Sequence, residues 1–146
     1  MTLAEQVGSL KRALHRVLVR RLAGSTDRPL LQLSALRVVA RDEARTASEL
    51  SARLLIDAPA ASRLVDRLAR DGLLRRAQGP DRRRVHLKLT AAGRSELRLL
   101  NEALGSVDDE LRQHLTPKEL DTAKRLLAKL QHALLADGPN QDRASD

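Results

Sequence analysis

The sequence predicts a mainly α-helical fold with one small β-hairpin, because of its composition and a single change in its apolar periodicity. The chain has 146 residues, of which 42% are hydrophobic, and it contains no Phe, Tyr or Trp. Its core must therefore be aliphatic, and Leu and Ala favour helices packed on helices. Apolar residues recur every three or four positions along most of the chain, but at every second position between residues 84 and 89.

Helix boundaries follow from capping residues. Thr46 and Glu49 have the hydroxyl-to-carboxylate spacing of a capping box, which starts a short helix. Asp57 is a second N-cap, with Pro59 tolerated in the first turn, and Gly72 is a C-terminal stop. The predicted helices cover approximately residues 3–22, 34–41, 46–54, 57–71, 91–114 and 117–135.

The hairpin is predicted between the fourth and fifth helices. Residues 73–77 form a first strand, residues 78–81 a turn, and residues 84–89 a second strand. In the second strand Val85, Leu87 and Leu89 alternate with polar residues, which is typical of a strand with one buried face.

Positive charge is concentrated in the middle of the chain. The formal net charge is +8, and residues 53–94 alone hold 11 basic and 4 acidic side chains. Residues 95–146 hold 7 basic and 10 acidic side chains. A localised basic region is typical of a surface that binds a polyanion. A solvated, Arg-rich surface is the alternative that charge alone leaves open.

Two short helices joined by a tight turn and followed by a hairpin with a basic tip describe a winged helix-turn-helix. The second helix of such a pair fits the DNA major groove. Here it is the helix 57–71, whose apolar residues Ala61, Leu64, Val65 and Leu68 are predicted to face inward.

Two motifs in this region resemble the MarR family of transcription regulators. Residues 58–68 and 71–76 resemble the family's recognition helix and first wing strand. Asp81, Arg83 and residues 87–93 match the wing pattern D-x-R-x-x-x-(apolar)-x-L-T-x-x-G. The resemblance implies a transcription regulator, expected to be a repressor, that binds double-stranded DNA at a pseudo-palindromic operator.

The resemblance also implies a domain organisation. Residues 1–137 form a single domain, with dimerisation helices at about 3–22 and 91–135 around a DNA-binding lobe at about 34–90. Residues 138–146 are expected to be a disordered tail. The apolar stripes of the terminal helices agree with a homodimer, since they exceed what a thin monomer buries; packing within one chain is the alternative.

DNA-binding roles are assigned by residue type. Arg63 is expected to read guanine in the major groove, and Ser62 to contact a base or a phosphate. Arg67 and Arg70 are expected to contact phosphates, with ion pairs to Asp66 or Asp71 as the alternative. The remaining candidates are Ala58 and Ala60, beside thymine methyls, and Arg82, Arg83 and Arg84, one of which enters the minor groove.

Many members of the MarR family release DNA when a small anionic or phenolic compound binds. Without aromatic residues, an effector pocket here must use aliphatic walls and basic anchors. His15, Arg16 and Arg20 are the candidate anchors, and the alternative is that they face solvent or DNA.

Other classes of function are disfavoured by what the sequence lacks. It has no Cys, hence no thiol chemistry, and its four His are scattered without metal-ligand spacing. It has no Gly-rich phosphate loop or nucleophile elbow, so neither an enzyme nor a cofactor is expected. No signal peptide or membrane-spanning run is present, which predicts a cytoplasmic protein. The alternative function is a winged-helix module whose basic face binds an acidic protein.

Overall fold

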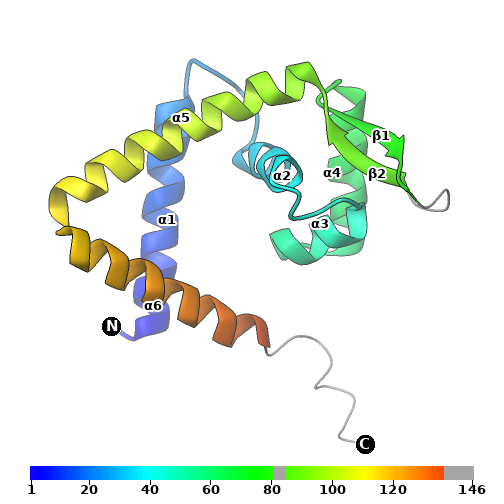
Figure 1. Ribbon diagram of the computed structural model, residues 1–146. Coiled ribbons are helices and arrows are strands. Elements are labelled where there is room, and N and C mark those ends of the chain that lie inside the picture. The colour runs from blue at the N-terminus through cyan, green and yellow to red at the C-terminus, as the bar shows by residue number, and fades with distance from the viewer. Residues whose placement is uncertain (81–84, 137–146) are drawn as a thin grey trace, which may run out of the picture. The chain divides into compact units, whose positions relative to one another are not determined.

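The computed structural model describes residues 1–80 and 85–136, and the chain divides into two compact units after Gly105 (Figure 1). The mainly helical fold with one antiparallel hairpin is the one that the sequence predicts. In chain order the elements are α1 (Leu3–Leu22), α2 (Leu30–Ala40), α3 (Ala47–Leu54), α4 (Ala58–Arg70), β1 (Leu74–Gln78), β2 (Val85–Leu89), α5 (Ala91–His114) and α6 (Pro117–Ala136).

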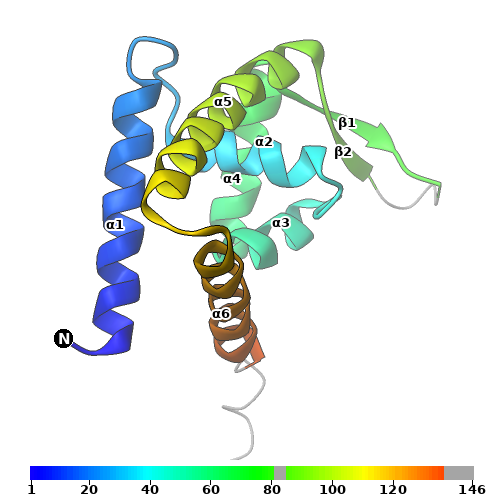
Figure 2. The ribbon, with the colours of Figure 1, turned by 60° about the vertical axis from the view of Figure 1, so that its left-hand side comes forward.

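The core of the first unit is aliphatic, and its centre is formed by four elements, to which buried residues of α1, β2 and α5 are added. Its largest fully buried side chains are Leu33, Leu36, Leu50, Leu68 and Leu74. They come from α2, α3, α4 and β1, which lie together in Figures 1 and 2. Burial of these side chains drives the packing of the short helices, because helices of 8 to 13 residues are marginal in water by themselves.

Helix α2 begins earlier than the sequence predicts. The expected start was Ser34, but the helix begins at Leu30, directly after Pro29 as N-cap. Pro29 has no side-chain hydrogen bond to offer, so the start is set instead by burial of Leu33 against the core. A polar capping signal is therefore absent from the sequence at this point.

The turn between α3 and α4 is set by backbone conformation and a cap. Leu55 adopts a left-handed conformation, with φ 57° and ψ 44°, and ends α3. Asp57 then accepts a hydrogen bond from the Ala60 backbone N–H at 2.7 Å, which confirms it as the N-cap of α4. The expected capping box of α3 forms only in part, since Glu49 accepts from the backbone N–H of Arg45 instead of that of Thr46.

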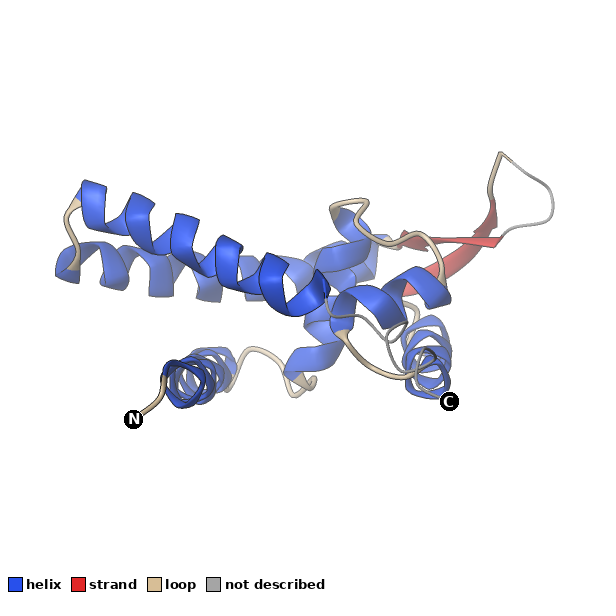
Figure 3. Ribbon diagram, turned by 90° about the horizontal axis from the view of Figure 1, so that it is seen from below, coloured by secondary structure: helices blue, strands red, loops and turns tan. Residues whose placement is uncertain are grey.

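The hairpin pairs Leu74 with Leu89 at its base and Gln78 with Val85 at its far end. Both strands are within one residue of their predicted positions, and the hairpin extends away from the helices of its unit (Figure 3). Leu87 N–H donates to the Arg45 carbonyl at 2.7 Å, so the chain segment before α3 adds to the edge of β2. This contact anchors the hairpin to the helix-turn-helix.

Helix α5 starts against the base of the hairpin. Thr90 caps it by accepting from the Gly93 N–H at 3.0 Å, and the Thr90 N–H donates to the Leu73 carbonyl at 3.1 Å. A Cβ at Gly93 would lie 2.1 Å from the Leu73 carbonyl oxygen. Only a glycine allows this close approach between helix and strand.

The terminal helices differ from the core helices in burial. In α1 only Leu18 and Leu22 are buried, whereas the stripe from Leu3 to Leu14 is exposed. Helix α6, in the second unit, buries no residue. Within the described residues, no helix combines the length and apolarity needed to cross a membrane.

Candidate nucleic-acid interface

One face of helix α4 is buried against the core, and the opposite face is exposed. Its buried residues are Ala61, Leu64, Val65 and Leu68, all of which were predicted to face inward. Helical geometry turns Arg63, Arg67 and Arg70 to the opposite side, and all three are exposed. The buried face holds α4 on the core, so the arginine side chains project from a rigid element.

The remaining candidates on α4 are small residues. Ala58 and Ser62 are exposed, while Ala60 is half-buried in the first turn. The start of α4 therefore carries no large side chain at these positions. A flat, methyl-lined surface of this kind lets a helix approach base edges closely.

Arg63 and Arg70 form no hydrogen bond or ion pair with any other residue in the described parts of the chain. Two exposed guanidinium groups without a carboxylate partner are available to bind an anion. The predicted alternative for Arg70, an ion pair with a neighbouring aspartate, does not occur among the described residues.

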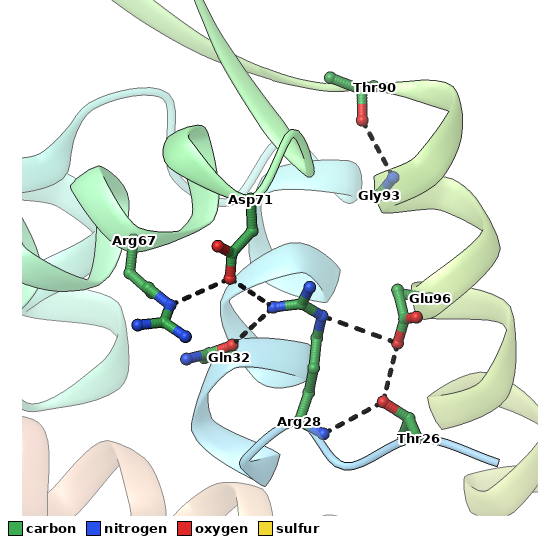
Figure 4. Close-up of polar contacts among 8 residues, drawn as sticks. All are labelled: Thr26, Arg28, Gln32, Arg67, Asp71, Thr90, Gly93 and Glu96. Atoms are coloured by element: carbon green, nitrogen blue, oxygen red, sulfur yellow. Dashed lines mark hydrogen bonds and ion pairs between the residues drawn. The ribbon is translucent and has the colours of Figure 1, made fainter.

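Arg67 is held by a polar network at the end of α4, shown in Figure 4. Its Nε donates to Asp71 Oδ2 at 3.0 Å, and the same oxygen accepts from Arg28 Nη1 at 2.8 Å. Arg28 also donates to Gln32 Oε1 at 3.2 Å, and its Nε lies 4.0 Å from Glu96 Oε2. The network thus joins α4 to the segment before α2, to α2 itself and to α5.

Asp71 is the centre of this network. Its side chain is 22% exposed and it caps the end of α4. Hydrogen bonds from Arg28 and then from Arg67 hold the pKa of the Asp71 carboxyl below its usual value. The Arg67–Asp71 pair is the alternative that helical spacing left open beside the expected phosphate contact. No local sequence signal indicates Arg28 and Glu96, because they are distant from Asp71 in sequence.

The hairpin contributes a second ion pair to α4. Arg76 on β1 donates to Asp66 on α4, an interaction between residues 10 apart in sequence. The three wing arginines Arg82, Arg83 and Arg84 lie outside the described residues. The strands that lead to them are anchored on both sides, by Asp66 and by the Arg45 carbonyl.

The candidate effector anchors lie elsewhere. His15, Arg16 and Arg20 are exposed on α1, and Arg16 and Arg20 point away from the buried side chains Leu18 and Leu22. In the parts of the chain that the structure describes, no group of three His, Asp or Glu side chains is placed to hold a metal ion.

Comparisons with known proteins agree with this geometry. Residues 26–84 match the family model described as MarR family. No curated protein sequence matches the chain. The solved structures that resemble it include MarR from E. coli in its apo form, with a TM-score of 0.71 and 28% identity over 89% of this chain and 97% of that one.

Two further structures are similar. A mutant E. coli MarR complexed with operator DNA gives a TM-score of 0.73 at 28% identity, over 88% of this chain and 92% of that one. MepR from S. aureus bound to ethidium bromide shares the fold, with a TM-score of 0.60 at 20% identity, over 92% of this chain and 97% of that one. The family-model match over residues 26–84, the similarity to the operator-bound structure and the exposed arginines of α4 together support a MarR-family winged-helix regulator.

Proposed function

We propose that the chain binds a specific double-stranded DNA operator as a homodimer and represses transcription from it. The observation that carries this proposal is the exposed face of α4, where Arg63 and Arg70 have no partner within the described residues. A similar E. coli protein, at 28% identity, was crystallised in complex with operator DNA, which supports DNA binding by this chain. A protein of this kind is a cytoplasmic binding protein and not an enzyme.

Within the interface we assign Arg63 to base readout and Arg70 to phosphate contact. Arg63 lies two turns closer to the start of α4, the end that enters the major groove in helix-turn-helix proteins. Arg67 keeps part of its guanidinium free while Asp71 fixes its direction, so it is a positioned phosphate contact. Ser62, Ala58 and Ala60 border the bases, and Arg82, Arg83 and Arg84 supply the wing contacts.

Dimerisation is proposed from the apolar residues that the terminal helices leave exposed. On α6, Leu127 is 48% exposed and Leu134 is 73% exposed; on α1, Leu10 is 57% exposed. A second copy of the chain would cover these stripes and bring two α4 helices to the two halves of a palindrome. We also propose His15, Arg16 and Arg20 as the anchors of a small anionic effector that releases DNA.

The DNA proposal is tested by selecting binding sequences from a pool of random duplexes with the purified protein. We expect an inverted repeat to be enriched, and its binding to weaken steeply with salt. The Arg63→Ala variant should bind the selected site about 10- to 100-fold more weakly, with a smaller loss on random DNA. Arg70→Ala should weaken binding to both DNAs by a similar factor.

The matched control is Arg125→Ala, which removes the same charge from an exposed position on α6. It should leave the affinity for the selected site unchanged. Equal losses on specific and random DNA for Arg63→Ala would refute base readout. Binding without any enriched sequence would refute the operator and favour the protein-interaction module.

A further inference from the structure

A basic cleft lies between the end of α2, the hairpin and the start of α5, away from the free face of α4. Its volume is about 580 Å³, within the range of small-molecule sites. Its polar lining consists of Asp42, Arg45, Arg75, His86, Lys88 and Arg94. Val39 and Ala40, at the end of α2, also line the cleft.

Arg75 and Lys88 face each other across the hairpin. They are paired directly in the strand register, so their side chains lie on the same face of the hairpin. Like charges at directly opposed positions destabilise a strand pair. This pair therefore costs the apo protein stability unless negative charge lies nearby.

No carboxylate among the described residues forms an ion pair with Arg75 or Lys88. The hydrogen bond from Arg45 is the main cause that lowers the pKa of Asp42, and the charge of Lys88 helps to lower it. Arg75 and Lys88 have no hydrogen bond or ion pair with any described side chain, and Arg94 donates only to the Leu89 carbonyl, at 3.3 Å. The cleft's one described carboxylate, Asp42, is bonded to Arg45 at 2.8 and 2.5 Å. Arg76, on the other face of the hairpin, is by contrast neutralised by Asp66.

We propose that this cleft is an oxyanion-binding site, in which Arg75, Lys88 and Arg94 hold a phosphate or similar doubly charged group. A guanidinium fork matches the oxygen geometry of a phosphate, and the lysine adds a point charge. The aliphatic surface beside the cations suits a short apolar part of a small organic ligand. The site is separate from Arg16 and Arg20 on α1, and the inference does not depend on the operator proposal.

Thermal unfolding of the full chain with inorganic phosphate, against chloride at equal ionic strength, tests the site. Phosphate should raise the Tm of the wild type in a saturable manner, because it binds only the folded state. Lys88→Gln should weaken phosphate binding about tenfold, the size expected for one charge-assisted hydrogen bond. Lys88→Glu should abolish the phosphate effect and raise the Tm measured without phosphate, since it places a carboxylate opposite Arg75.

The variant Arg125→Ala, at an exposed position on α6, is the matched control, and its response to phosphate should equal that of the wild type. A wild-type Tm that responds equally to phosphate and chloride would overturn the proposal. So would a phosphate response that survives Lys88→Glu. A cooperative thermal transition of Lys88→Glu without phosphate, at a Tm no lower than that of the wild type, would establish that this variant folds, so that a lost phosphate response reports on the site.

A DNA titration of Lys88→Glu then identifies the source of the oxyanion. Loss of the phosphate response with unchanged DNA affinity supports a free small anion. Loss of both, together with competition between phosphate and DNA, supports a backbone phosphate of DNA at the same site. Failure of the operator proposal would instead appear in Arg63→Ala and would leave the phosphate response intact.

Discussion

Helices α4 and α6 both place leucines at helical spacing, but the two helices use them differently. Helix α4 has 13 residues and buries four of them against the core of its own unit. Helix α6 has 20 residues and buries none. A stripe of apolar residues in the sequence therefore shows that a helix is amphipathic, but it does not show which surface packs against the apolar side. The apolar side of α4 packs against other elements of the same chain, and we propose that the apolar side of α6 packs against a second copy of the chain.

The largest effect is expected in the core beside α4. Leu68 is 0% exposed, and Leu68→Ala should lower the free energy of unfolding by about 2–5 kcal/mol, since it removes buried methyl groups and leaves a cavity. Urea unfolding measures this change. Sedimentation should show an unchanged oligomeric state. A shift to monomer would mean that packing around α4 also affects the dimer contacts proposed for α6.

For α6, by contrast, a substitution in the leucine stripe should weaken the dimer. Leu127→Glu places a charge on the exposed stripe and should raise the dissociation constant of the dimer about a hundredfold or more. Sedimentation equilibrium measures it. Arg125→Glu, on the opposite side of α6, is the control and should leave the dimer intact. A monomeric wild type would contradict the proposed cover of α6.

A smaller effect is expected where α5 meets the hairpin. Gly93→Ala should destabilise the fold by about 1–3 kcal/mol, because the new Cβ collides with the Leu73 carbonyl oxygen. Gly105→Ala, in the same helix, has open space around its Cβ and should stabilise by about 0.5–1 kcal/mol. Chemical unfolding of both variants distinguishes close packing from helix propensity, and equal effects would refute the close approach.

The smallest effect concerns the polar end of α4. Because the folded state lowers the pKa of Asp71, its contribution to stability is present above pH 4 or so and is lost as the pH falls below the unfolded value. Asp71→Asn should therefore be less stable than the wild type at neutral pH, and the two should converge in acid. Urea unfolding at both pH values checks this; a difference that persists in acid would assign the effect to packing.

Local sequence signals predicted most element boundaries. Asp57 caps α4 as predicted, and Thr90 and Thr116 cap α5 and α6 through the same kind of local side-chain hydrogen bond. The inward residues of α4 were also predicted correctly. The alternation predicted for β2 holds only in part, since Leu87 is buried but Val85, at the far end of the hairpin, is 52% exposed. Helix α2 was misplaced because no polar cap marks its start and burial of Leu33 decides it.

Some features of the candidate interface also follow from local sequence signals, whereas others depend on tertiary contacts. The sequence by itself determined that α4 carries Arg63, Arg67 and Arg70 opposite an apolar face, because helical periodicity is local. Only the tertiary structure decided which of these cations are neutralised. Arg28 meets Asp71 across 43 positions, and the opposition of Arg75 and Lys88 depends on strand register. Contacts between distant residues depend on how elements pack, and no short-range pattern encodes them.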